Sequence, residues 1–309
     1  MKRLLSIVVS IGLLFLLYRA VDFQGTLNLL KNYNPYSLSL SLLLSIPIFF
    51  FHCLRLNILC RPFFKLKNAL SFKLISLALS LNLILPAKLG DIGKAYFLSQ
   101  EKTVSRSKSF SIVLMEKIND LIGLVGVCLI GLVFIRHDIH YFKLAFIPLF
   151  LFLLSAVSLL FSKTLFSYFR ILLPKKINSK LEPFFSTFRH LQHYNQTHLK
   201  ESLLAITLSF FVSLAHLLQL WYLFQSITEI SFTLIIGLTP LAILAAFLPL
   251  SISGVGVRDL SFVGLYTPFT GPESAVGFGL LATLRVVWLA IPGSLFITKG
   301  TLKKVKNLI

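Results

Sequence analysis

Residues 85–91 read LPAKLGD, and this short stretch interrupts an otherwise apolar region with a proline, a glycine and two charges. Proline and glycine free backbone polar groups, which lipid tolerates only inside protein or beside a water-filled cavity. A second interruption of the same kind has the sequence LPLSISGVGVRD at residues 248–259. We therefore expect two broken apolar segments, one in each half of the chain.

Long apolar stretches surround both breaks and define the class of protein. The chain has 309 residues, of which 56% are hydrophobic and only 13% charged, yet its formal net charge is +19. A membrane-spanning helix needs about 20 mostly apolar residues. Stretches of this kind exclude a soluble domain, a disordered chain and a nucleic-acid partner, despite the basic charge. The sequence predicts an all-α integral membrane protein with apolar stretches at Leu4–Tyr18, Ser37–Leu59, Ala69–Leu85, Phe110–Ile135, Leu144–Phe161, Ser202–Phe224, Phe232–Leu250 and Ala275–Ile297.

The first stretch, Leu4–Tyr18, is short, but Arg3 and Arg19 bracket it and can reach both headgroup layers. It also resembles a signal peptide. Because no small-residue cleavage site follows, we expect an uncleaved first helix. The chain is then a single membrane domain over residues 1–309.

The distribution of Lys and Arg predicts the orientation. Basic residues mark cytoplasmic loops, so the loop 163–200 and the C-terminal tail are expected in the cytoplasm, and the uncharged loop 225–231 outside. Both termini of this multi-pass protein of the cell membrane would then be cytoplasmic. The Phe-interleaved, basic loop 163–200 resembles an interfacial amphipathic helix on anionic lipid.

Counting crossings gives a parity conflict. Residues 60–68 and 88–108 both carry cytoplasmic signatures, the first from Arg55, Arg61, Lys65 and Lys67, and the second from Lys88, Lys94, Lys102, Arg106 and Lys108. The conflict disappears if residues 69–98 and 232–269 are re-entrant hairpins that enter and leave on one side. The alternative is that one basic loop violates the orientation rule.

The hairpin hypothesis implies about six spanning helices and two inverted halves. The first half covers residues 37–135 with hairpin 69–98, and the second covers residues 202–297 with hairpin 232–269. Paired broken segments in inverted halves point to the central site of a transporter.

Charged residues at membrane depth are the candidates for that site, because each needs a partner or a watery surrounding. Glu116 and Asp120 lie four apart on one helical face, with Lys117 expected to point elsewhere. Arg285, alone in an apolar helix, is a natural partner for them. Arg55 and Lys73 are expected to extend to the cytoplasmic edge.

The second break offers an anion site. Backbone N–H groups around Gly254 and Gly256 could form an anion nest beside Arg258, with Asp259 adjacent. We expect these residues and Arg285 to bind substrate, and Asp91, Glu116 and Asp120 to line a polar cavity or carry protons. The alternative is structural ion pairing, such as Glu116–Arg285 or Asp91–Arg258.

Other motifs are weak. The histidines His137, His140, His190, His193 and His198 lie in predicted loops without a complete ligand set, so no metal or other cofactor is expected. His52 and His216 lie on apolar helices, where a neutral histidine bonded to a neighbour is expected, with a proton relay as the alternative. Cys53, Cys60 and Cys128 are interpreted as buried hydrophobic residues.

At its breaks and charges the chain resembles the membrane domain of lysylphosphatidylglycerol synthases, a flippase-like family. The resemblance spans nearly the whole chain and rests on LPxxxGD at 85–91 with Lys94-Ala95-Tyr96, Val104–Ser107, VLMEKINDL at 113–121, PxSxSGVGVRD at 249–259, and Ala282 with Arg285. Three positions depart from the family pattern: Asp259 replaces the usual glutamate, Lys117 an arginine and Ile252 a proline. Only twelve residues follow Ile297, so the soluble aminoacyl-transferase domain and lysine transfer are not expected.

The resemblance implies a protein that moves a lipid headgroup between leaflets. Carried over residue by residue, it implies that Asp91, Glu116, Asp120, Arg258, Asp259 and Arg285 line or brace that path. The expected function is flipping of a lipid with a phosphate-bearing headgroup, either an anionic phospholipid or a polyprenyl-linked lipid. Two alternatives stay open: a membrane transferase acting on a lipid-linked donor, and a non-catalytic partner subunit of a lipid-modifying enzyme. Such an enzyme, or a second copy of the chain, would be the protein partner.

Overall fold

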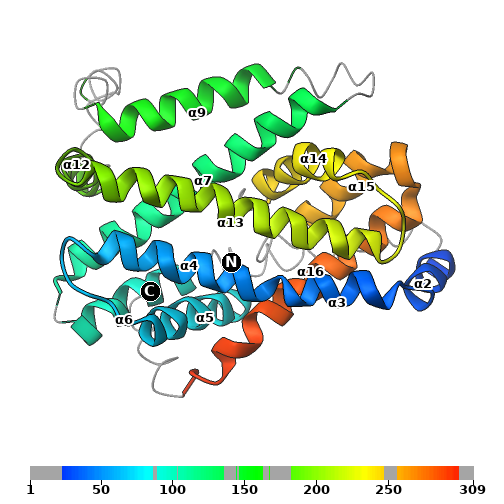
Figure 1. The fold of residues 1–309 in the computed structure, drawn as a ribbon, viewed down its shortest axis with the longest axis horizontal. Coiled ribbons are helices and arrows are strands. Elements are labelled where there is room, and N and C mark those ends of the chain that lie inside the picture. The colour runs from blue at the N-terminus through cyan, green and yellow to red at the C-terminus, as the bar shows by residue number, and fades with distance from the viewer. Residues whose placement is uncertain are drawn as a thin grey trace.

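The computed structural model describes residues 23–85, 89–102, 104–135, 144, 146–162, 167, 182–246 and 256–298. The elements within these ranges are helices (Figure 1). They are α2 (Phe23–Lys31), α3 (Pro35–Leu43), α4 (Ser45–Cys60), α5 (Asn68–Ile84), α6 (Gly90–Lys102), α7 (Arg106–Phe134), α9 (Phe146–Phe161), α12 (Glu182–Thr197), α13 (Leu199–Gln225), α14 (Phe232–Ala245), α15 (Val257–Thr270) and α16 (Pro272–Ser294).

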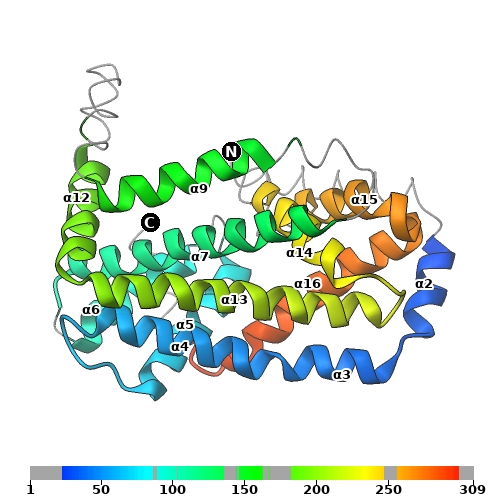
Figure 2. The ribbon, with the colours of Figure 1, turned by 45° about the horizontal axis from the view of Figure 1, so that its top comes forward.

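Four of the described segments are long and apolar enough to cross a bilayer: Pro35–Cys60, Arg106–Phe134, Leu199–Gln225 and Pro272–Ser294. The all-helical membrane class is therefore confirmed, with element bounds close to those predicted. The pair α3–α4 lies beside α13 along the long axis of the molecule (Figure 2). The predicted first helix, Leu4–Tyr18, lies outside the described residues, and α9 is a shorter apolar helix of 16 residues.

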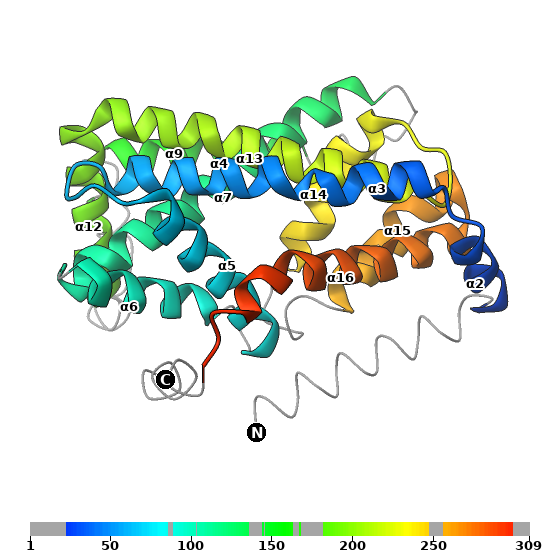
Figure 3. The same ribbon diagram turned by 60° about the horizontal axis from the view of Figure 1, so that its bottom comes forward.

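The two halves of the chain interlock through their short helices. The helices on either side of each break pack together, α5 on α6 and α14 on α15, while α16 packs on α5 and α7 packs on α14 (Figure 3). Glycine makes both crossings possible. A methyl group on Gly131 would overlap the backbone of Gly237, and one on Gly293 would overlap the carbonyl of Ser76. The last helix of each half thus supports the helix that leads into the other half's break.

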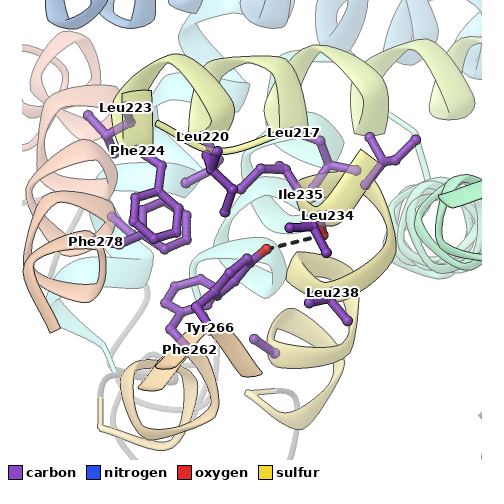
Figure 4. Close-up of a cluster of buried hydrophobic side chains, with 14 of the residues drawn as sticks. Leu217, Leu220, Leu223, Phe224, Leu234, Ile235, Leu238, Phe262, Tyr266 and Phe278 are labelled. Atoms are coloured by element: carbon purple, nitrogen blue, oxygen red, sulfur yellow. Dashed lines mark hydrogen bonds between the residues drawn. The ribbon is translucent and has the colours of Figure 1, made fainter. Parts of the chain in front are cut away.

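Two hydrophobic cores lie along the long helices. One joins the C-terminal parts of α7 and α13 to α14, α15 and α16. In it the rings of Phe224 and Phe278 stack with centroids 4.2 Å apart, beside Phe262 and Tyr266 (Figure 4). The Tyr266 hydroxyl lies 2.6 Å from Oγ1 of Thr239, so its polar end is satisfied within the core.

The second core joins α4, α5, α6, α12 and the N-terminal parts of α7 and α13. In the loop 163–200, expected to hold an interfacial helix, the structure describes α12, while residues 163–166 and 168–181 lie outside the described residues. The apolar face of α12 is buried on protein: Phe185, Leu191 and Tyr194 are at most 8% exposed and belong to this core. The sequence shows an amphipathic face but not whether lipid or protein covers it.

Amide side chains of α12 also terminate α9. The last carbonyl groups of a helix have no partner within the helix. Gln192 Nε2 donates to the carbonyls of Leu159 (2.7 Å) and Ser162 (3.1 Å), and Asn195 Nδ2 donates to that of Leu160 (3.2 Å). The polar residues of α12 therefore cap the end of α9, while the apolar face of α12 packs in the second core.

Candidate functional site: a buried ionic network and two arginines

Arg55 on α4 is the centre of a buried ionic network, although the sequence analysis expected it to extend to the cytoplasmic edge. Its side chain is 0% exposed. Nη1 donates to Asp120 and to Ser209 Oγ (2.8 Å), and Nη2 donates to Glu116 Oε1 (3.0 Å). The two carboxylates share one face of α7, as predicted, but the cation between them comes from α4 and not from Arg285.

Two lysines complete the network, and both correct an expectation. Lys94, counted as a cytoplasmic marker, is 2% exposed and donates to Glu116 Oε2 at 2.6 Å. Lys117, expected to point elsewhere, lies 3.0 Å from Asp91 and 3.7 Å from Asp120. The network therefore contains three cations and three carboxylates and has no net charge.

Contacts between α5, α6 and α7 also stabilise the helix ends on either side of the first break. Asp91 lies in the first turn of α6, where the helix dipole favours a carboxylate. Asn82 on α5 accepts the N–H of Gly90 at 2.8 Å, which closes the turn from the other side. The position of Asp91 is thus set by its own helix, by α5 and by Lys117 on α7.

At the second break, Asp259 binds the groups that were expected to bind an anion. Its carboxylate accepts the N–H of Gly256 (3.1 Å) and two N–H groups of Arg258 (2.8 and 3.1 Å). Gly256 has φ 91°, a conformation that favours glycine, and begins α15. Arg258 also donates to Thr283 Oγ1 at 2.5 Å. Gly254 lies outside the described residues, and the substrate-binding role of this break stays a prediction.

Arg285 on α16 is half-buried, and it differs from the buried Arg55 and Arg258 because neutral groups hold it. Nε donates to Gln219 Oε1 at 2.5 Å, and Nη2 donates to Nδ1 of His216. Gln219 is fully buried and in turn donates to the carbonyl of Ser41 (2.9 Å) and to Ser45 Oγ (3.1 Å). Among the ion pairs of the described residues, none includes Arg285. Neither alternative pair, Glu116–Arg285 or Asp91–Arg258, is among them.

Two histidines join Arg285 to the ionic network. Nδ1 of His52 lies 3.2 Å from Nη2 of Arg55, and its Nε2 lies 3.2 Å from Nε2 of His216. Both histidines are thus bonded to neighbours, as the sequence analysis expected. A continuous polar chain runs from the first half of the molecule to the second.

An apolar groove reaches the same region from the side. Its volume is about 530 Å³, and it lies between α4, α5 and α16. Its lining includes the exposed residues Ile46, Phe50, Trp288 and Ile291. Ser45, which also lines the groove, accepts the indole N–H of Trp288 at 3.0 Å and is bonded to Gln219, the partner of Arg285. Trp288 also follows Arg285 by one helical turn.

The sequence singled out the carboxylates, Arg258 and Arg285 as candidates, but it did not indicate Gln219, and it placed Arg55 and Lys94 at the cytoplasmic side. Lys94 lies three residues after Asp91, so a helix through residues 90–102 could have placed it on the same side as that carboxylate. Lys73, expected to extend to the edge, is 43% exposed and pairs with Glu101 at 3.0 Å. Cys60 and Cys128 are buried, as interpreted from the sequence, whereas Cys53 is half-buried.

The helices and the paired charges between them define a multi-pass membrane protein. A family model described as the lysylphosphatidylglycerol synthase TM region matches residues 3–292, and the chain belongs to that family. No match was found among curated proteins. The family resemblance deduced from the breaks and charges is therefore confirmed.

Proposed function

We propose that the protein translocates a lipid with a phosphate-bearing headgroup between leaflets, with Arg285 and Arg258 facing the headgroup. The observation that carries this proposal is that the groove, which suits an acyl chain, is lined by Ser45, and that Gln219 bonds both Ser45 and Arg285. An apolar groove with a cation near its lining fits an amphipathic anion. The membership of the family supports a substrate that is a lipid.

The charge balance favours an anionic headgroup. The ionic network around Arg55 is balanced, and Arg258 is paired with Asp259. Arg285 is then the remaining cation of this group, held by the neutral Gln219 and His216. A cation at membrane depth needs a counter-ion or a watery site, and a phosphodiester, with one negative charge, would supply the counter-ion.

The short helices support the re-entrant arrangement that we propose for the two breaks. α5 and α14 have 17 and 14 residues. At 1.5 Å per residue they extend roughly 21–26 Å, less than the ~30 Å of a hydrocarbon core. A Lys102→Cys variant, in a chain whose native cysteines are replaced by alanine, should resist labelling from outside intact cells, whereas Gly271→Cys should be labelled.

The transport proposal is tested with purified protein in liposomes that contain fluorescent phosphatidylglycerol. Reduction of the outer-leaflet dye by dithionite should reach beyond the half that protein-free liposomes show. Arg285→Gln should abolish this increase. Arg189→Gln is the matched control, because Arg189 is 53% exposed on α12 and pairs only at the surface with Glu182.

An unchanged leaflet distribution with the native protein would refute translocation of this lipid. Lipids extracted from the same liposomes are then separated by chromatography. A new lipid species formed from a supplied donor would favour the transferase alternative, with Asp91 or Asp259 as the candidate base.

A further inference from the structure

The contact between His52 and His216 has a property that follows from their other partners. The guanidinium of arginine only donates hydrogen bonds. Nη2 of Arg55 lies 3.2 Å from Nδ1 of His52, and Nη2 of Arg285 is bonded to Nδ1 of His216. Both Nδ1 atoms must therefore accept, so each neutral ring carries its proton on Nε2.

The two Nε2–H groups consequently face each other. The Nε2 atoms are 3.2 Å apart and the ring centroids 5.5 Å apart. The difference is close to two ring radii, so both nitrogens lie near the line that joins the rings. Each Nε2–H points at the Nε2 of the other ring, which has no free lone pair. The accepting lone pair of that ring is on Nδ1 and is already bonded to an arginine. The pair presents two donors and no acceptor.

Among the described residues, the charged groups bonded to this pair are Arg55 and Arg285, and both act as donors to it. Arg55 is held by Glu116 and Asp120, so its charge is retained and it stays a donor. Gln219, which accepts from Arg285 Nε, leaves Nη2 of that arginine to His216. Two donors at one point, between two guanidinium groups, are the arrangement that an anionic oxygen requires.

We propose that His52 and His216 form an anion-binding site that opens around one oxygen of a phosphate group, with each Nε2–H donating to it. The proposal rests on the proposed function in that the phosphate would belong to the transported lipid. It deepens that function by adding two specificity residues, one from α4 and one from α13. The site then selects a phosphate diester or monoester by donors from both halves of the chain.

Binding is measured on the full chain in detergent by calorimetry with dihexanoyl phosphatidylglycerol. His216→Phe, which keeps an aromatic ring but removes the donor, should weaken binding about tenfold or more, the usual effect of losing a hydrogen bond to a charged group. His52→Phe should do the same. His193→Phe is the matched control, because His193 is exposed on α12 and should leave binding unchanged.

A second experiment identifies the source of the phosphate. It uses the native protein, so it does not depend on whether the variants fold. In native protein labelled with ¹⁵N-histidine, the Nε2 signals of His52 and His216 should shift when the short-chain lipid is added. Competition by inorganic phosphate at millimolar concentration would show that the phosphate alone is recognised, and its absence would assign the site to the lipid. Either result supports the anion site.

Unshifted Nε2 signals, or native affinity in both phenylalanine variants, would overturn the proposal. These outcomes are distinguishable from failure of the proposed function. Lipid binding that depends on the histidines but without translocation would leave the anion site standing. Translocation that is unaffected in both variants would leave the function standing and refute the site.

Discussion

Replacing Arg55 by methionine tests whether the buried network is structurally essential. Methionine is also long and unbranched, so the packing of α4 changes little, but Glu116 and Asp120 lose their shared cation. Removing one partner of a buried ion pair costs about 3–5 kcal/mol. Glu116 keeps Lys94 at 2.6 Å, while Asp120, 24% exposed, keeps only Lys117 at 3.7 Å. Because one carboxylate stays compensated, we expect the lower end of that range, about 3 kcal/mol.

The assay is reversible unfolding by SDS titration in mixed micelles, followed by circular dichroism. Lys73→Met is the control, because the pair that it breaks is 43% exposed on both sides and should cost less than ~1 kcal/mol. Adding Asp120→Asn to Arg55→Met should recover much of the loss. Adding Glu116→Gln should not, because it leaves Lys94 buried without its carboxylate.

If Arg55→Met were no more destabilising than Lys73→Met, the buried network would not be essential to the stability of the fold. Equal recovery of stability on adding Asp120→Asn or Glu116→Gln would also contradict the expected difference between the two carboxylates. That result would mean that the two carboxylates are equivalent, whereas their remaining partners differ in distance and burial.

Two further predictions concern packing. Gly293→Val should lower the free energy of unfolding by about 1–3 kcal/mol or more, because the valine side chain would overlap the backbone of Ser76. Thermal melting in detergent measures this loss, and Gly264→Val is the control that should melt close to native, because Gly264 has open space around it. Equal losses in the two variants would exclude the close helix crossing as the cause. Tyr266→Phe should cost about 1 kcal/mol by losing the hydroxyl contact with buried Thr239, and adding Thr239→Val should recover part of that loss if the contact is its cause.

The helices were largely predictable because a membrane span is a property of a single stretch of sequence. The apolar stretches located α7, α13 and α16 within a few residues, and the proline and glycine residues predicted the interruptions between α5 and α6 and between α14 and α15. The spacing of Glu116 and Asp120 predicted that they share a face. All of these are local properties, set by the geometry of one helix.

The pairing of charges was not predictable in the same way. A helix face is fixed by sequence, but the helix that packs against it is not. Arg55 therefore pairs with α7 and does not extend to the membrane edge, and Lys94 points inward to Glu116 although it lies near a basic loop in the sequence. The same limit applies to α12, whose apolar face looks alike whether lipid or protein covers it. Nothing in the sequence marked Gly131 and Gly293 as sites of close helix crossings, because such a crossing depends on the residue opposite, on another helix.

The crossing of α16 on α5 has a consequence for synthesis of the chain. Gly293 and Ser76 lie at opposite ends of the sequence, yet their backbones touch. α5 therefore leaves the ribosome long before α16, the helix that will pack on it, exists. Until α16 is made, the side of α5 that will meet it has no partner from its own chain, so assembly of the first half must wait for the last helix. A chain interrupted before α16 would be expected to depend on insertion factors or to be degraded.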